Sequence, residues 1–241
     1  MTRDALYAEP REMIVDFAFD EHVAAVFPDM IRRSVPGYAE IIALTGLFAE
    51  RHVVDGTRCY DLGGSLGAAT LSMRRRIKAR DTRIIAVDSA EAMVERCREN
   101  VAADGAGVPV EVRCADIREV AIENASLVVL NFTLQFIPPE ERRELLRRIR
   151  QGMVPGGALL LAEKIAFADA KEQRFQEEMH LAFKRANGYS ELEISQKRTA
   201  LEQVLVPETL EAHQGRLAEA GFTSSHVWFR CFNFAAIVAL T

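Results

Sequence analysis

The chain has 241 residues, 49% of them apolar, and carries a formal net charge of −5. That length suffices for one large domain or two small ones with a substantial core. The acidic balance argues against a protein that grips nucleic acid mainly through phosphate contacts.

Cysteine, histidine and the N-terminus narrow the class of protein further. The four cysteines and five histidines lie far apart, without a C-x-x-C pair, so we expect reduced thiols and no metal site. The opening residues MTRDALYAEPREM lack the apolar core of a signal peptide, and no apolar run reaches membrane-spanning length. We therefore predict a cytoplasmic protein that contacts neither a membrane nor nucleic acid directly.

In chain order, a helical cap is expected over residues 1–56, with breaks at Pro28 and Pro36. Residues 57–163 alternate between apolar runs and helical patterns. Strands are predicted in TRCYDLG, TRIIAVD, VPVEVRC, ASLVVLNF and GGALLLAEK, and helices over Leu66–Arg80, Ala90–Ala103 and PPEERRELLRRIRQGM. Strict alternation predicts a parallel sheet with helices on both faces.

The rest of the chain departs from this alternation. Residues 164–206 read as a helical insert, largely helical from Phe167 to Ser195. Residues 207–241 read as a helix between Pro207 and Gly221, followed by the strands SSHVWFRCF and FAAIVALT. The layout resembles that of class I S-adenosylmethionine-dependent methyltransferases. It implies one α/β, Rossmann-like domain with a mostly parallel sheet of seven strands.

Three glycines, Gly63, Gly64 and Gly67, stand between the first predicted strand and its helix. Without a Cβ they permit positive φ and let a ligand lie directly on the backbone. The turn falls at the carboxyl edge of the sheet, where open α/β folds bind ligands. Its spacing departs from G-x-G-x-x-G, which disfavours a nicotinamide cofactor. A tight turn without any ligand is the alternative.

Polar residues end the next three predicted strands. Asp88 ends the second, where a carboxylate can accept both hydroxyls of a ribose; capping the next helix is the alternative, and Ser89 could do that equally well. Asp116 follows the third strand, where it could accept the adenine amino group while Ile117 offers a backbone N–H, unless it is a solvated turn residue. Asn131 ends the fourth, where a polar side chain must find a partner. Together these residues favour an adenosine-containing cofactor, S-adenosylmethionine.

Four stretches carry a closer resemblance, which extends from about Arg3 to Leu240. VFPDMIRRSVPGY, YDLGGSLGAATLS, IENASLVVLNFTLQF and FKRANGYSELEISQKR closely resemble the carboxy-S-adenosylmethionine synthases of the tRNA wobble-uridine pathway. The glycine turn and LNF are generic to methyltransferases, whereas FPDMIRRSVPGY and KRANGYSELEISQKR are specific to this family. The family turn reads DLGCSLG, so Gly64 stands here in place of a cysteine; a contact through the backbone should survive that change.

The resemblance implies a role for each matching residue. Ten residues would contact the cofactor: Tyr38; Gly63, Gly64 and Ser65 at the methionyl end; Asp88 and Ser89 at the ribose; Asp116 and Ile117 at the adenine; Asn131 near the sulfonium; and Arg198 at the carboxylate that distinguishes the modified cofactor. Whether Arg198 reaches its own pocket or a partner's stays open.

The family reaction is a carboxylation in which prephenate supplies carbon dioxide and phenylpyruvate leaves. A sulfonium acidifies its methyl group, and the carbon nucleophile formed from it would be quenched by water, so a closed, dry pocket is expected. Phe132, Leu134 and Phe136 are candidate walls, although at least one of them should simply pack in the core.

Prephenate carries two carboxylates, and FKRANGYSELEISQKR supplies cations in Lys184, Arg185, Lys197 and Arg198. A solvated helix face is the expected role of Lys184 and Lys197, whereas the resemblance assigns Arg198 to a carboxylate. No histidine or cysteine stands out as a general base. Hydroxide lost from prephenate together with carbon dioxide could fill that role.

Two other functions remain compatible with these residues. One is a conventional small-molecule or tRNA methyltransferase, whose tRNA version the acidic charge weakens. The other is a non-catalytic scaffold for the enzyme that transfers the carboxymethyl group to tRNA, which the cluster at Gly63, Asp88, Asp116 and Asn131 disfavours. The resemblance also implies functional coupling to that enzyme and a homodimer, with the helical insert as the expected interface.

Overall fold

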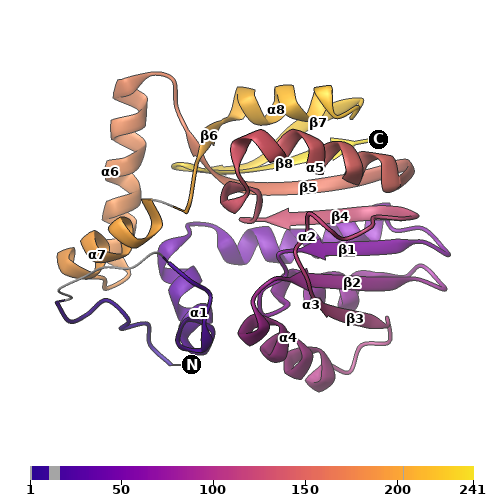
Figure 1. Ribbon diagram of the computed structural model, residues 1–241, viewed down its shortest axis with the longest axis horizontal. Coiled ribbons are helices and arrows are strands. Elements are labelled where there is room, and N and C mark those ends of the chain that lie inside the picture. The colour runs from indigo at the N-terminus through magenta and orange to yellow at the C-terminus, as the bar shows by residue number, and fades with distance from the viewer. Residues whose placement is uncertain (1, 11–16, 203) are drawn as a thin grey trace.

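The computed structural model describes residues 2–10, 17–202 and 204–241 (Figure 1). Its helices are α1 Glu21–Ser34, α2 Tyr38–His52, α3 Ala68–Arg76, α4 Glu91–Ala103, the short 3₁₀ helix η1 Leu134–Phe136, α5 Pro139–Gly152, α6 Ala170–Ala186, α7 Glu191–Glu202 and α8 Leu210–Glu219. Its strands are β1 Arg58–Leu62, β2 Arg83–Asp88, β3 Val110–Cys114, β4 Ala125–Asn131, β5 Met153–Ala166, β6 Glu208–Thr209, β7 Ser224–Cys231 and β8 Phe234–Leu240.

The strands form one twisted sheet in the order β3-β2-β1-β4-β5-β8-β7, which can be followed from bottom to top of Figure 1. Strands β1 to β5 pair in parallel, whereas β8 is antiparallel to both β5 and β7. The chain leaves β1 towards β2 and β3 and later returns to add β4 on the other side. The strand order therefore reverses between β1 and β4, and a crevice opens at their carboxyl ends.

Alternation of side chains along the strands builds a core on each face of the sheet. In β1, Tyr60 and Leu62 join one core and Cys59 joins the other. Helices α5 and α8 close the first core, and α2 and α3 close the second. Each large apolar side chain buried in this way contributes about 1.5–3 kcal/mol, which fixes the strand register and hence the places where the strands end.

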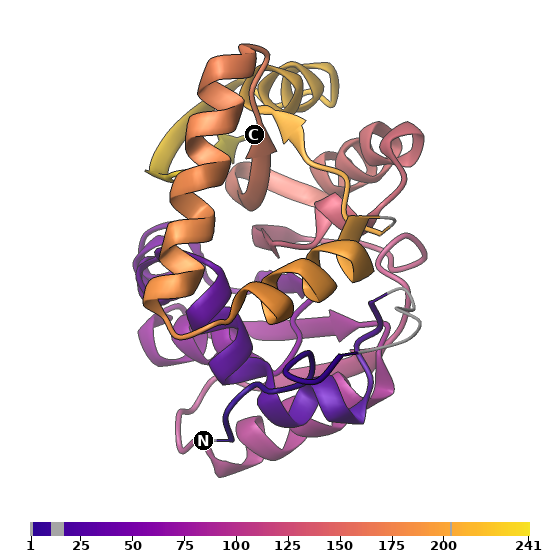
Figure 2. The same cartoon turned by 90° about the vertical axis from the view of Figure 1, so that its left-hand side faces the viewer.

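Helices α1, α6 and α7 lie at the carboxyl edge of the sheet, clear of its two faces (Figures 1 and 2). Gly188, at φ +81°, allows the chain to turn between α6 and α7. Figure 2 shows α7 crossing in front of this edge with the N-terminal segment beside it. These helices therefore cover the crevice at the end of the parallel strands.

The α/β, Rossmann-like fold with a mostly parallel sheet is confirmed, with eight strands in place of seven. The additional strand, β6, is a two-residue pairing of Glu208 and Thr209 with the end of β5, too short to show a sequence pattern. The predicted break at Pro28 is wrong, because Pro28 lies inside α1. An N-cap hydrogen bond to Asp20 and the burial of one face against α4 hold the helix together there.

Candidate functional site

A cavity of about 360 Å³ lies where the strand order reverses, at the carboxyl edge of the sheet. We call it the central cavity; strand ends and turns form its floor, and α1, α6 and α7 contribute to its walls. Nine of the ten predicted cofactor residues line it: Tyr38, Gly63, Gly64, Ser65, Asp88, Ser89, Asp116, Ile117 and Asn131. The fold thus gathers residues that are almost a hundred positions apart in the sequence.

The glycine turn is tied to β2, because the N–H groups of Gly63 and Gly64 both donate to the carbonyl of Val87, at 2.8 and 2.9 Å. Gly63 has φ +79°, and a Cβ there would lie 2.2 Å from Oγ1 of Thr133. Only glycine fits this position. A Cβ on Gly64 would meet nothing closer than an Asp61 oxygen at 3.3 Å, so the cysteine expected there from the resemblance would need only a small adjustment.

Asp61, which the sequence reading left out, also lines the central cavity. Its Oδ2 accepts hydrogen bonds from the backbone N–H (3.0 Å) and the hydroxyl (2.6 Å) of Thr70, which anchors the first turn of α3. Burial raises the pKa of the Asp61 carboxyl to about 6. Its position directly before the glycine turn, at the end of a buried strand, was the signal that could have identified it.

Asp88 joins two segments at the end of β2. Its Oδ2 accepts from the N–H of Ser65 at 2.9 Å and its Oδ1 from the N–H of Ala90 at 3.0 Å. Burial raises the pKa of this carboxyl. Helix α4 has Ala90 at its N-cap position with no side-chain cap, so Asp88 bridges the glycine turn and the approach to the helix. A carboxylate can accept about four hydrogen bonds, which leaves capacity for ribose hydroxyls.

Asp116, the predicted acceptor for the adenine amino group, is already paired with an arginine. Arg118 donates Nε to both carboxylate oxygens at 3.0 Å and Nη2 to Oδ2 at 2.5 Å, and this guanidinium holds the pKa of Asp116 below its usual range. Arg118 also reaches Glu141 at 2.7 Å. The turn places Arg118 two residues after Asp116, close enough for a bidentate pair, so an adenine amino group would have to share the carboxylate with it.

Asn131 presents a buried side-chain amide to the cavity. Its Oδ1 and Nδ2 are both buried and have no hydrogen-bond partner among the described residues, although the side chain lines the cavity. An unsatisfied buried amide costs about 1–3 kcal/mol. The next residue, Phe132, is held at φ +59°, an uncommon conformation for a residue other than glycine and one that clusters at functional sites. A polar ligand in the cavity would satisfy this amide.

Aromatic side chains wall the cavity beside Asn131. Phe132 and Phe136 line it, and the ring of Tyr38 lies 6.1 Å from that of Phe132. Burial raises the pKa of the Tyr38 hydroxyl, which keeps it neutral. Leu134, the third candidate wall, is fully buried in the core instead, as expected for at least one of the three.

Three lysines line the side of the cavity nearest β5: Lys164, Lys184 and Lys197. The expectation of a solvated helix face is wrong for Lys184 and Lys197, which are only 9% and 5% exposed. Lys164 was missed, although it follows the same rule as Asp88 and Asn131 of a polar residue near the end of a buried strand. Helices α6 and α7 fold back over the sheet edge and so turn these side chains inward.

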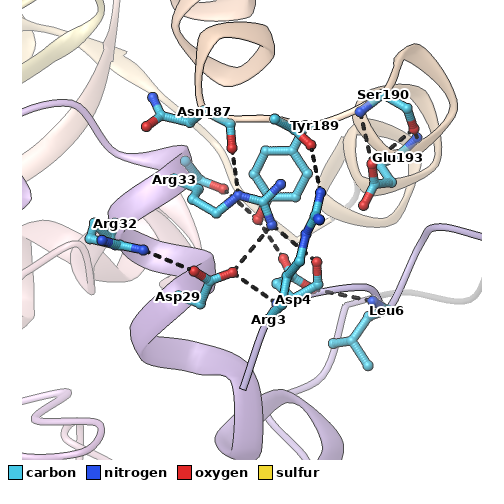
Figure 3. Close-up of polar contacts among 12 residues, drawn as sticks. Arg3, Asp4, Leu6, Asp29, Arg32, Arg33, Asn187, Tyr189, Ser190 and Glu193 are labelled. Atoms are coloured by element: carbon cyan, nitrogen blue, oxygen red, sulfur yellow. Dashed lines mark hydrogen bonds and ion pairs between the residues drawn. The ribbon is translucent and has the colours of Figure 1, made fainter. Parts of the chain in front are cut away.

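The N-terminal segment explains how Lys197 is held, because it carries Asp4, which Figure 3 shows beside Asp29 and Arg33 of α1. Asp4 is buried, and its carboxylate accepts from the hydroxyl of Tyr189 at 2.5 Å and from Nζ of Lys197 at 3.4 Å. Its backbone N–H donates to Asp29 at 2.9 Å, and its carbonyl accepts from Arg33 at 3.1 Å. Asp4 thereby joins the N-terminal segment to α1 and α7.

Arg198 is the one predicted residue that does not line the central cavity. It lines an adjoining hollow of about 280 Å³, which shares Lys164, His180 and Lys184 with that cavity. Consecutive residues of a helix project in different directions, and the neighbouring Lys197 takes the direction towards Asp4. Arg198 therefore stands near the lysines and away from the residues predicted for ribose and adenine.

Replacing Asn131 with alanine is expected to separate ligand binding from stability. The variant loses no protein hydrogen bond, so its melting temperature should not fall, whereas its affinity for S-adenosylmethionine should weaken roughly 5- to 150-fold. Asn124→Ala is the matched control, because its Nδ2 donates to the carbonyl of Gly56 at 2.8 Å and it lies outside the cavity. Calorimetry should show weaker binding only for Asn131→Ala, and thermal melts should show a lower melting temperature only for Asn124→Ala. If Asn131→Ala instead has a lower melting temperature and unchanged affinity, Asn131 is a structural residue.

Known proteins are similar to this chain in sequence and in fold. The methyltransferase-domain family model matches residues 60–157. Carboxy-S-adenosyl-L-methionine synthase of Geobacter sp. (strain M21) is 61% identical over 99% of both chains. The enzyme of that name from Shewanella putrefaciens is 60% identical over 99% of this chain and 98% of its own.

The chain belongs to the carboxy-S-adenosyl-L-methionine synthase family. It is accordingly an enzyme of the transferase class, and its family and fold support binding of S-adenosyl-L-methionine. This confirms the family resemblance seen in the sequence.

Solved structures agree at the level of the fold. A structure from Methanococcus maripaludis, described as a candidate S-adenosyl-L-methionine-dependent methyltransferase, has a TM-score of 0.61 at 20% identity and covers 96% of this chain and 98% of its own. The cyclopropane synthase MmaA2 of Mycobacterium tuberculosis has a TM-score of 0.57 at 17% identity, over 77% of this chain and 62% of its own.

Among the described residues, no three His, Cys, Asp or Glu side chains come together as metal ligands would. None of the described helices is long and apolar enough to cross a membrane.

Proposed function

We propose that this enzyme converts S-adenosyl-L-methionine to carboxy-S-adenosyl-L-methionine, with prephenate as carboxyl donor and phenylpyruvate as second product. The product would supply the 5-oxyacetyl modification of wobble uridines in tRNA. The supporting observation is the group of lysines packed beside the cofactor cavity of a member of this family. Transfer of a methyl group alone would not need cations there, whereas an anionic co-substrate would.

The residues of the cavity suit S-adenosyl-L-methionine in the following arrangement. Asp88 and Ser89 hold the ribose, Asp116 and Ile117 the adenine, and the glycine turn with Ser65 the methionyl end. Asn131 satisfies its amide on the ligand near the sulfonium, and Tyr38 covers it. Arg198 binds the new carboxylate from the adjoining hollow.

The atoms of the proposed reaction balance without a further reactant. Prephenate loses its ring carboxyl as carbon dioxide and its hydroxyl as hydroxide when the ring becomes aromatic. Hydroxide takes one proton from the methyl group on sulfur and becomes water. That carbon then forms a bond with carbon dioxide, so one carboxylate replaces one hydrogen. No protein side chain is needed as the base.

This chemistry requires that bulk water stay out of the cavity. The rings of Phe132 and Phe136 face it from the loop after β4, and Phe17, Phe19 and Phe27 line it from the N-terminal side. Phe19 packs edge-on against Phe136 at 5.5 Å, which joins the two sets of rings.

Incubation of the purified protein with S-adenosyl-L-methionine and prephenate tests the proposal. Mass spectrometry should show carboxy-S-adenosyl-L-methionine and phenylpyruvate in equal amounts. No carboxy-S-adenosyl-L-methionine should form when prephenate is omitted or replaced by phenylpyruvate. Release of S-adenosylhomocysteine with a methylated acceptor would identify a conventional methyltransferase instead. Binding of the cofactor without any turnover would favour the scaffold.

A further inference from the structure

Lys164 and Lys184 meet at one end of the central cavity. Lys164 stands near the carboxyl end of β5, opposite Phe234 of β8. Lys184 lies in the last turn of α6 and is 9% exposed. Both also line the adjoining hollow, so the pair stands where the two spaces join.

The charge of the cavity lining changes sign along the carboxyl edge of the sheet. Asp116 follows β3, Asp88 ends β2, the amide of Asn131 ends β4, and Lys164 lies near the end of β5. Because β2 and β5 are three strand spacings apart in the sheet, about 14 Å separates the acidic end from the basic end. An adenosyl ligand that binds its ribose at Asp88 would reach Asn131 with its sulfur and leave the lysines to another molecule.

The three lysines of this region differ in their partners. Lys197 has Asp4 and the hydroxyl of Ser34 within 3.4 Å. Among the described residues, no carboxylate forms an ion pair with Lys164 or Lys184 and no hydrogen bond from either ammonium group is seen. A buried ammonium group without an anion is costly, so an anionic ligand is the component that this end lacks.

The lowered pKa values of Lys164 and Lys184 also indicate that this end of the cavity lacks a negative charge. Burial, with the neighbouring cations Lys197, Lys164 and Arg198, lowers the pKa of Lys184 to about 7. Burial also lowers the pKa of Lys164, which Glu177 only partly offsets. The nearby His180 already has a hydrogen-bond partner, since its Nε2 lies 2.8 Å from the carbonyl oxygen of Ser34.

We propose that Lys164 and Lys184 form an anion-binding subsite that holds the carboxylates of a dicarboxylate co-substrate, at the end of the central cavity beyond Asn131. The inference rests on the proposed function, in which prephenate is that co-substrate. Lys197 is a positioning residue, because its ammonium group is held by Asp4 and fixes α7 over the subsite.

Direct binding of prephenate tests the subsite without turnover. The protein is first saturated with S-adenosylhomocysteine, which has no sulfonium methyl group, and prephenate is then titrated by calorimetry. Lys184→Met and Lys164→Met should each weaken prephenate binding about 30-fold. This value is the lower end of the range of affinity losses that follow removal of one partner of a buried charge pair. Lys184→Arg should recover part of the loss. Lys171→Met, exposed on the same helix α6, should bind as the wild type does.

Two further readouts distinguish this role from a structural one. Affinity for S-adenosylhomocysteine should stay within about twofold in both methionine variants, and their melting temperatures should not fall, because an unpaired buried charge is removed. If S-adenosylhomocysteine binding weakens and prephenate binding does not, the lysines hold the amino-acid carboxylate of the cofactor and the proposal is wrong. Unchanged prephenate affinity in both variants would overturn it as well.

The binding test of the subsite and the turnover test of the proposed reaction can fail separately. Lysine-dependent prephenate binding by a protein that makes no carboxylated product would keep the subsite and reject the proposed reaction. Carboxylation with normal prephenate affinity in both methionine variants would keep the reaction and reject the subsite.

Discussion

Asp88→Ala is expected to weaken binding of S-adenosyl-L-methionine by at least about tenfold. The carboxylate already accepts two backbone hydrogen bonds at 2.9 and 3.0 Å and lies on the cavity wall. Each charge-assisted hydrogen bond to a ribose hydroxyl contributes roughly 1.5–3 kcal/mol, and one such bond alone gives the tenfold effect. Calorimetry measures it, and Glu95→Ala, exposed on α4, controls for the loss of one negative charge.

The loss at Asp88 must be separated from a disturbance of the turn at Ser65. A ligand lacking both ribose hydroxyls serves this purpose in a double-mutant cycle. The wild type should bind it much more weakly than the complete ligand, whereas Asp88→Ala should bind the two ligands almost equally. Equal penalties for the missing hydroxyls in both proteins would place the ribose elsewhere and leave Asp88 as a residue that only supports the turn.

Arg198→Ala is expected to lose far more affinity for the carboxylated cofactor than for the ordinary one. A guanidinium forms a bidentate fork with a carboxylate, and only the carboxylated form has a carboxylate at the carbon that was the methyl group. The gap should be about 2–5 kcal/mol if the pair is well desolvated, and less if water reaches the hollow. Arg198→Lys keeps the charge but not the fork and should fall between.

Binding isotherms for both ligands with each variant measure this gap. Arg185→Ala is the control, because that side chain forms an exposed ion pair with Glu191 at 2.5 Å and lines neither the cavity nor the hollow. Equal losses for both ligands would make Arg198 a general structural residue. A wild type that does not prefer the carboxylated ligand would favour the conventional methyltransferase.

The floor of the site was predictable because it depends on local rules. Buried parallel strands are recognisable in a sequence as apolar runs, and their carboxyl ends lie at one edge of the sheet. This placed Gly63, Asp88, Asp116 and Asn131 together from sequence alone. Asp61 and Lys164 obey the same rule, because each lies near the carboxyl end of a buried strand.

The walls of the site were not predictable, because they depend on contacts between distant segments. Lys184 and Lys197 lie in a charged helical stretch that is typical of a solvated surface. Their burial follows from the fold of α6 and α7 over the sheet edge and from the contact of Lys197 with Asp4, which is 193 positions away. Arg198 likewise lines the adjoining hollow and not the central cavity, a placement that depends on how α7 packs.

A carbon-13 label in the ring carboxyl of prephenate tests the central claim most directly. The purified enzyme is supplied with unlabelled S-adenosyl-L-methionine, the labelled prephenate and an excess of unlabelled bicarbonate, and the product is weighed by mass spectrometry. We predict carboxy-S-adenosyl-L-methionine that carries the label on the carbon attached to the former methyl group, with phenylpyruvate free of it. A carboxylated product without the label, or no carboxylated product at all, would contradict the account.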